Sequence, residues 1–436
     1  IKFSSIVTSI IFLYMIIYEW GVFESISNTI IYPIKMLLPL ALLLFPIKKY
    51  IGNHVYFNNF ILCYFLFILW SLVPSLFGGN PEDSIEQWLK FLSRFIFCVL
   101  ASRFLLVNES ALRLVMKAFV ITGLFSFLQY IALLFFKFTG IFSFSSFEMG
   151  RGIYFGPYGI LGNVGSAMSF PSLGFIYRFH GFWLEPSRAS GFMIACYFLS
   201  MNLFYLERKI FWKRAAFVSL IAGFLCFSNA GYLAIGVAML FGFFMNFLTG
   251  KASVFNFGIK AGIAGILVFL ALFGRTYVAE NFIEYDIARA VAGVRGGSCA
   301  GTTCGGVNYS VNPSDGRLVG YKKNLSIVNE HPLGLGIRVT GKNDKKTGLT
   351  DTGGNAIIQW LLYTGYIGLF ILLLRELQVF LYAIKYVKKN KSIMYLTQAW
   401  IALFIQNLLY GNIMTPAYLL IIIFLFATKR NIVSKE

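Results

Sequence analysis

Ionisable residues gather in two polar segments of a chain that is otherwise strongly hydrophobic. The first segment, 138–186, ends in the sequence RFHGFWLEP, and a serine and an arginine follow it. A carboxylate or an imidazole there could accept a proton from an attacking hydroxyl, and the arginines could bind an anion. A helix start at Glu185-Pro186 gives Glu185 a structural alternative as a helix cap. The candidate site residues of this stretch are Arg178, His180, Glu185 and Arg188.

The second polar segment, 275–354, contains NPSDGR and then NEHPLGLGIR. The pattern predicts a turn and then an amphipathic helix from Asp315 to Glu330, which His331-Pro332 ends. Arg317 would lie at the helix N-terminus, where free N–H groups favour an anion and a planar guanidinium can bind two phosphate oxygens. We therefore expect a pyrophosphate site, with His331 as a second candidate base and Arg338 as an alternative cation. The residues expected to pack inward are Leu318, Tyr321, Leu325 and Val328.

Three further cations interrupt apolar runs. Lys35 lies in the second run, and Lys90 and Arg94 lie one turn apart in the fourth. At 1.5 Å per helical residue, all three would lie only about 7 to 14 Å below the outer surface of the membrane that they span. A charge at that depth costs roughly 2 to 3 kcal/mol unless it finds a partner or reaches the surface. An anionic ligand at the outer leaflet is the functional interpretation, and snorkelling is the alternative.

Cysteines separate into two groups. Four lie within apolar runs, whereas Cys299 and Cys304 lie close together in the long polar segment. These two are the plausible disulfide partners, which would place the segment in an oxidising compartment. A zinc site needs four ligands, and this segment offers one histidine and no second cysteine pair. We predict no metal ion and no cofactor.

Composition defines the class of protein. Hydrophobic residues make up 58% of the 436 residues, the mean hydropathy is +0.73 and the formal charge is +19. A soluble domain could not bury this much apolar surface, so we predict an all-α polytopic membrane protein. The basic excess lies mostly in short segments between apolar runs, which argues for membrane topology and against nucleic acid binding. The first apolar run is expected to act as an uncleaved insertion signal.

About 12 transmembrane helices are predicted, with two long periplasmic loops between them. The predicted spans are 4–20, 28–47, 57–77, 85–106, 112–137, 187–206, 212–228, 230–248, 257–274, 355–375, 393–410 and 412–428. This divides the chain into helices 1–5 (1–137), a first loop (138–186), helices 6–9 (187–274), a large loop with amphipathic helices (275–354), and helices 10–12 with a tail (355–436).

Charge asymmetry orients these spans. With both termini cytoplasmic, the short outer turns carry acidic residues and no Lys or Arg, and the inner segments carry many basic residues. The acidic residues are Glu19, Glu24, Glu82, Asp83 and Glu86. The basic residues are Lys2, Lys48, Lys49, Arg103, Arg113, Lys117, Arg208, Lys209, Lys213, Arg214, Lys251, Lys260, Arg375, Lys385, Lys388, Lys389, Lys391, Lys429, Arg430 and Lys435. Both long loops are therefore predicted to be periplasmic.

The combination of motifs resembles the bacterial O-antigen polymerase (Wzy) family, within the O-antigen ligase and polymerase superfamily. The matching residues are Arg178, Gly181 and Glu185-Pro186, then Asp315-Gly316-Arg317, then His331-Pro332 with Gly334 and Gly336, and finally Gly365 and Gly368 in GYIG. With the twelve-span layout, the resemblance covers the whole chain. Each motif is short.

The resemblance implies a metal-independent glycosyltransferase of lipopolysaccharide biosynthesis at the periplasmic face of the inner membrane. It would transfer a growing glycan from undecaprenyl pyrophosphate to the terminal sugar of an incoming lipid-linked repeat unit. Arg317, Glu185 and His331 would be catalytic, and Arg178, His180, Arg188, Lys35, Lys90, Arg94 and Arg338 would bind substrate. Implied partners are the lipid-linked oligosaccharide, membrane lipids, a chain-length regulator (polysaccharide co-polymerase) and a flippase.

One departure separates polymerase from ligase. The ligase branch typically has a catalytic histidine before the tenth span and an Asn-containing motif at the Glu-Pro position. Before the tenth span this chain has the sequence GLTDTGGNAIIQW, with Asp351 and no histidine. This difference favours the polymerase. The alternatives are an O-antigen ligase that transfers polymer to lipid A-core, and a polysaccharide flippase or transporter. Large outer loops argue against a transporter, which keeps its site near the midplane.

Overall fold

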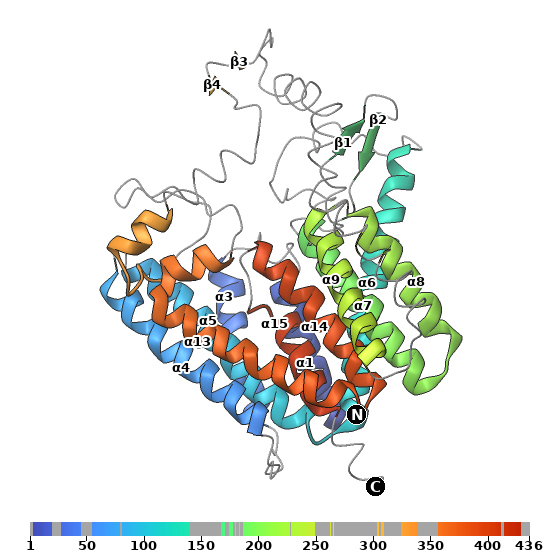
Figure 1. The fold of residues 1–436 in the computed structure, drawn as a ribbon, viewed down its shortest axis with the longest axis horizontal. Coiled ribbons are helices and arrows are strands. Elements are labelled where there is room, and N and C mark those ends of the chain that lie inside the picture. The colour runs from blue at the N-terminus through green and yellow to red at the C-terminus, as the bar shows by residue number, and fades with distance from the viewer. Residues whose placement is uncertain are drawn as a thin grey trace.

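The protein is a bundle of helices in a computed structural model (Figure 1). The structure describes residues 3–19, 28–44, 55–78, 81–138, 167–170, 174–177, 179, 183, 186–226, 228–248, 262, 265, 303–304, 307–308, 324–337, 356–410 and 414–428. Its helices are α1 (Phe3–Glu19), α3 (Asn28–Leu37), the 3-10 helix η1 (Leu40–Leu44), α4 (Val55–Phe77), α5 (Pro81–Leu105), α6 (Glu109–Phe138), α7 (Pro186–Glu207), α8 (Ile210–Leu225), α9 (Asn229–Leu248), α13 (Ala356–Val387), α14 (Lys391–Tyr410) and α15 (Pro416–Ala427). A short helix also covers 324–330.

Two small hairpins accompany the helices. Strands β1 (Ala167–Phe170) and β2 (Gly174–Tyr177) pair antiparallel, as do β3 (Thr303–Cys304) and β4 (Val307–Asn308). Both hairpins lie in the predicted periplasmic loops, where the sequence pattern predicts no strands. The first hairpin and the helix over 324–330 lie at the same end of the bundle (Figure 1).

Length and composition make this a membrane-embedded protein. Within the described residues, six helices are long and apolar enough to cross a membrane: Val55–Phe77, Glu109–Ala132, Ser187–Glu207, Ala230–Leu248, Ala356–Val387 and Lys391–Leu409. Three shorter apolar helices accompany them: Ser5–Glu19, Pro33–Leu44 and Pro416–Ala427. The number of spans and their orientation remain predictions.

Helix positions agree with most of the predicted spans, with two differences in the described residues. The second predicted span breaks between α3 and η1, at Pro39, which cannot continue the hydrogen-bond ladder of a helix. Helix α13 continues past the predicted end at 375 to Val387. Arg375 is therefore a fully buried residue inside a helix, and counting it among the inner-loop charges was wrong. The predicted span 257–274 lies outside the described residues except for the helical Gly262 and Gly265.

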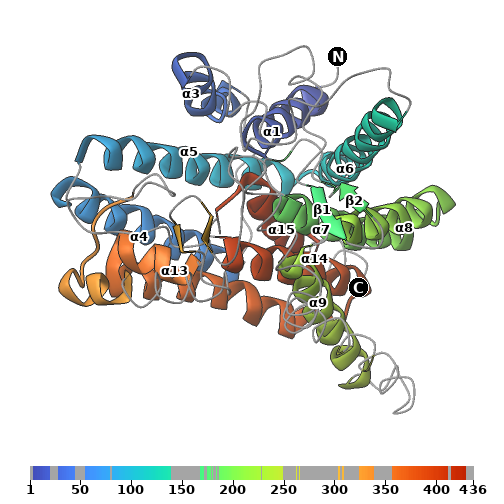
Figure 2. The ribbon, with the colours of Figure 1, turned by 90° about the horizontal axis from the view of Figure 1, so that it is seen from above.

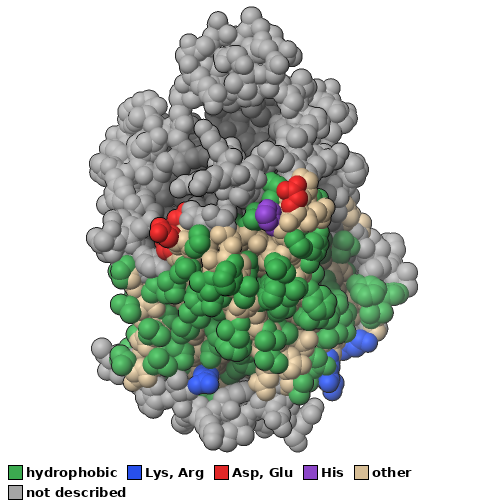
Figure 3. Space-filling model, turned by 90° about the vertical axis from the view of Figure 1, so that its left-hand side faces the viewer, with side chains coloured by type: hydrophobic (Ala, Val, Ile, Leu, Met, Phe, Trp, Pro, Cys, Tyr) green, Lys and Arg blue, Asp and Glu red, His purple; other side chains and the backbone are tan. Residues whose placement is uncertain are grey.

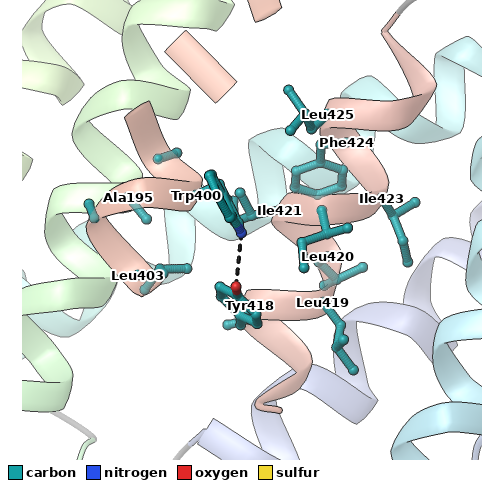
Figure 4. Packing of buried hydrophobic residues seen from close by; sticks show 14 of the residues in the cluster. Ala195, Trp400, Leu403, Tyr418, Leu419, Leu420, Ile421, Ile423, Phe424 and Leu425 are labelled. Carbon is teal, nitrogen blue, oxygen red and sulfur yellow. Dashed lines mark hydrogen bonds between the residues drawn. The ribbon is translucent and has the colours of Figure 1, made fainter. Parts of the chain in front are cut away.

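The short helix α15 forms the centre of the bundle. Every one of its 12 residues is buried, as expected for a helix that is apolar on all sides. It packs against α1, α5, α6, α13 and α14, and Figure 2 shows these helices around it. Figure 4 shows its side chains pointing outward in all directions, with the Tyr418 hydroxyl accepting a hydrogen bond from Trp400. At about 1.5 Å per residue it is too short to span a bilayer.

The side of the bundle that includes α4 and α13 carries a continuous hydrophobic band. In Figure 3 this band is broad, with Lys and Arg at one edge and Asp and Glu at the opposite edge. Exposed apolar side chains of α4 and α13 include Leu66, Leu69, Phe370 and Leu373. A band of this kind is suited to contact with lipid tails.

A break in α13 receives the HPLGLG segment. Gly365 has φ +64° and ψ −169°, a conformation that is essentially restricted to glycine. The break leaves backbone amides and carbonyls of α13 without partners in the helix, and the HPLGLG segment and Trp70 supply those partners. The Tyr366 amide donates to the Pro332 carbonyl (3.1 Å). The Leu362 and Tyr363 carbonyls accept from the amides of Leu335 (2.7 Å) and Gly336 (3.1 Å). The Trp70 indole donates to the Thr364 carbonyl at 2.8 Å.

Two motifs of the family resemblance, HPLGLG and GYIG, are therefore in direct contact. Gly334 and Gly336 also have positive φ, at +95° and +88°. A Cβ on Gly336 would lie 2.7 Å from the Pro74 carbonyl oxygen, so this glycine permits close backbone packing against α4. These glycines have a structural role: they fix the outer segment to the membrane-embedded helices.

Replacing Gly365 should detach this segment. In Gly365→Ala the new Cβ would lie 2.1 Å from the Pro332 carbonyl oxygen, in addition to the backbone strain, so we expect a loss of about 1 to 3 kcal/mol of stability. The measurement is the thermal unfolding midpoint of the purified protein in detergent. Ile367→Ala, an exposed position two residues away, is the matched control and should change little. A wild-type midpoint for Gly365→Ala would contradict the proposed docking.

Candidate functional site

Two of the predicted membrane cations meet on one aromatic ring. The Lys35 Nζ atom and the Arg94 guanidinium carbon each lie 4.9 Å from the centroid of the Tyr18 ring. A cation over a tyrosine ring gains about 0.5 to 2 kcal/mol, most where water is excluded. Lys35 comes from α3, Arg94 from α5 and Tyr18 from α1, so the ring gathers cations from separate helices.

Hydrogen bonds fix the backbones that carry these groups. Ser93, which precedes Arg94, donates its hydroxyl to the Lys35 carbonyl oxygen at 2.7 Å. The Tyr14 hydroxyl, one turn before Tyr18, lies 3.0 Å from the Ser93 hydroxyl. Helices α1, α3 and α5 are therefore joined at the level of the ring, which holds both cations in place.

An acidic residue beside Tyr18 connects the cations to the central helix. The Glu19 carboxylate accepts a hydrogen bond from the Ala417 amide (3.1 Å), in the first turn of α15, and another from the Thr415 side chain. The charges of Arg188 and Arg94 both act on this carboxylate. We call Tyr18, Glu19, Lys35, Arg94 and Arg188 the Tyr18 cluster; it draws on α1, α3, α5 and α7 and on the N-terminus of α15.

Lys90 has a local partner. Its Nζ atom lies 2.8 Å from a carboxylate oxygen of Glu86, one turn earlier in α5, with 21% of the Lys90 side chain exposed. Such a pair on a partly exposed helix face contributes only a few tenths of a kcal/mol. Lys90 is thus held near the acidic first turn of α5, one turn before Arg94.

Aromatic residues fasten the RFHGFW stretch to the bundle. Phe179 and Trp183 are buried, and the Phe179 amide donates to the Leu225 carbonyl at the end of α8 (2.9 Å). Trp183 packs against Phe192 of α7, with ring centroids 4.7 Å apart. The stretch therefore enters α7 beside Arg188, which lies in the first turn of that helix.

His331 is exposed at the end of the helix over 324–330. Its backbone amide donates to the Ile327 and Val328 carbonyls, which ends the helix as predicted. Val328 is buried, as expected, but Leu325 is exposed, so its predicted inward packing was wrong; Ile327 is buried in its place. The helix therefore presents Ile327 and Val328 to the core, and Leu335 and Ile337 of the following segment are buried as well.

Several predicted residues lie outside the described part of the chain. These are Arg178, His180, Glu185, Leu318, Tyr321, Arg317, Arg338 and Cys299. For Cys304 only the backbone, in β3, is described. Within the described part, the free cysteines are Cys63, Cys98, Cys196 and Cys226. The disulfide therefore remains a prediction.

Sequence reasoning missed a buried ion pair in the bundle. The Arg375 Nε atom donates to Glu376 at 2.9 Å, and the Tyr418 hydroxyl donates to the same carboxylate. The Arg375 guanidinium also lies 4.9 Å from the Tyr64 ring centroid. A fully buried arginine needs such partners. Adjacent Arg and Glu within the run LLLRELQVF were the available signal, because charges inside an apolar run are costly.

The Tyr18 cluster can bind an anion. Lys35 and Arg94 share the Tyr18 ring, and the charges of Arg94 and Arg188 act on Glu19, so three cations accompany one carboxylate. This excess of positive charge favours a negatively charged ligand. Arg94 and Arg188 could each bind two oxygens of a phosphate group. A comparison with protein-family models finds no match for this chain, and neither does a comparison with curated proteins.

Neutralising Arg94 should weaken anion binding. Because a hydrogen bond to a charged group contributes about 1.5 to 3 kcal/mol, Arg94→Gln should lower the affinity for inorganic pyrophosphate about ten- to a hundred-fold. The measurement is calorimetric titration of the purified protein in nanodiscs. The control is Arg103→Gln, an exposed arginine in the last turn of the same helix, which should bind like wild type. Equal weakening by both variants would mean that only net charge matters.

Proposed function

We propose that this protein is a polymerase of bacterial surface polysaccharide in the inner membrane. It transfers the growing glycan from undecaprenyl pyrophosphate to the terminal sugar of an incoming lipid-linked repeat unit at the periplasmic face. The single observation that carries the proposal is the meeting of Lys35 and Arg94 on Tyr18, with Arg188 near Glu19. Cations inside apolar helices suit the charged headgroup of a lipid-linked substrate.

Glycosyl transfer requires charge stabilisation at the leaving group. The acceptor hydroxyl oxygen forms a bond to the anomeric carbon of the donor, the bond from that carbon to the pyrophosphate oxygen breaks, and the hydroxyl proton passes to a base. Negative charge develops on the departing pyrophosphate, where Lys35 and Arg94 from the membrane side and Arg317 from the outer loop would stabilise it. Glu185 and His331 are the candidate bases.

The contact between HPLGLG and the break in α13 supports this reading. Two motifs shared with the O-antigen polymerase family are far apart in the chain, and backbone hydrogen bonds join them. Through this contact, the outer segment that contains Arg317 and His331 is tied to the membrane helices. Catalytic groups on an outer loop could then act on a headgroup held at the Tyr18 cluster.

A deletion strain tests the function through its lipopolysaccharide. Polymerase activity predicts a core bearing a single repeat unit. A bare core with accumulated lipid-linked polymer would instead indicate a ligase, and a bare core with units trapped inside would indicate a flippase. Arg317→Lys should also give single-unit lipopolysaccharide, because a point charge cannot replace the bidentate guanidinium, and the expected loss is roughly 100- to 1000-fold in rate.

The matched control is Lys345→Ala, a charge expected to be solvated in the same loop, which should restore the complete ladder. A normal ladder from Arg317→Ala at wild-type protein levels would remove Arg317 from the proposed mechanism and leave Arg178 or Arg338 as the candidate pyrophosphate clamp.

A further inference from the structure

Glu19 is an acidic residue placed among cations, where its effect on an anionic ligand is unfavourable. Its carboxylate lies at the N-terminus of α15, bound to the Ala417 amide and the Thr415 side chain, and near Arg94 and Arg188. A helix N-terminus and guanidinium groups each favour a negatively charged group such as a phosphate. The negative charge of Glu19 therefore lies within a region that attracts anions.

The proposed reaction changes the charge of the ligand. A glycosylated lipid pyrophosphate carries about two negative charges, and the lipid pyrophosphate that leaves gains an additional ionisable oxygen and carries closer to three near neutral pH. Cations that stabilise the leaving group consequently bind the product more tightly than the substrate. An enzyme with cations alone would release its product slowly, and release often limits turnover.

We infer that Glu19 sets the turnover of this site by limiting its affinity for the departing pyrophosphate lipid. Its charge opposes a third negative charge on the ligand while its carboxylate still binds the Ala417 amide at the N-terminus of α15. Glu19 is thus a residue that tunes release, rather than a base or a direct ligand of the substrate. This inference rests on the proposed function, since it concerns the product of the same site.

Glu19→Gln is the test variant. The amide oxygen of glutamine can still accept from Ala417, so packing is retained and only the charge is lost. Repulsion between two unit charges about 10 Å apart at an effective dielectric constant of about 20 corresponds to more than a tenfold change in affinity, so neutralisation should raise the affinity for a pyrophosphate lipid at least tenfold. In nanodiscs, the Kd for farnesyl pyrophosphate should fall at least tenfold, and the steady-state rate should fall while the single-turnover rate does not.

The controls separate charge from packing. Glu19→Asp keeps the charge and should bind farnesyl pyrophosphate like wild type. Glu109→Gln removes the same charge from an exposed pair with Arg113 in α6 and should also bind like wild type. Tightening by Glu19→Asp would overturn the inference, because packing rather than charge would then control affinity. Tightening for inorganic pyrophosphate alone would also overturn it, because the ligand would then be a free anion.

The outcomes also distinguish a failure of this inference from a failure of the proposed function. If Arg94→Gln weakens farnesyl pyrophosphate binding but Glu19→Gln leaves it unchanged or weaker, Glu19 is only structural and the inference fails alone. If Arg94→Gln binds farnesyl pyrophosphate like wild type, the Tyr18 cluster is not the headgroup site. The proposed function then loses its main support, and the inference falls with it.

Discussion

A charge inside an apolar bundle must have a partner, and this requirement shapes the centre of the molecule. Lys35 and Arg94 share the Tyr18 ring, and Glu19, on which the charges of Arg94 and Arg188 act, binds the N-terminus of α15. On the other side of α15, Tyr418 binds the Glu376 carboxylate that pairs with Arg375. The short central helix is therefore tied at its first turn to both groups of charges. Its apolar surface supplies the packing, and these polar contacts determine where it begins.

The need for a polar partner also explains how the HPLGLG segment is attached to the bundle. A helix that breaks at Gly365 must find partners for its freed carbonyls and amides, because unsatisfied backbone groups inside a membrane protein cost several kcal/mol each. The amides of Leu335 and Gly336, together with the Trp70 indole, provide them. The HPLGLG segment is thereby attached to α13 by backbone hydrogen bonds, and Gly336 packs closely against α4.

Hydrophobic runs predicted most of the helices, because about 20 apolar residues leave few other structures available in a membrane. The pattern also identified Lys35, Arg94 and Arg188 individually. It did not place them together, since contacts between α1, α3, α5 and α7 depend on how helices pack and not on spacing within any one of them. Glu19 was read as a boundary charge, whereas its role depends on Ala417, which is far away in the chain. The break at Gly365 was equally hidden, because glycine within an apolar helix is common.

The central claim is that the Tyr18 cluster holds the pyrophosphate of a lipid-linked glycan. The most direct measurement is an electron cryomicroscopy structure of the protein in nanodiscs with its lipid-linked repeat unit. We predict density for the two phosphates within hydrogen-bond distance of Lys35 and Arg94, on the side of the bundle where the HPLGLG segment is docked. Headgroup density at the exposed cations Lys209 and Arg103 instead would contradict it.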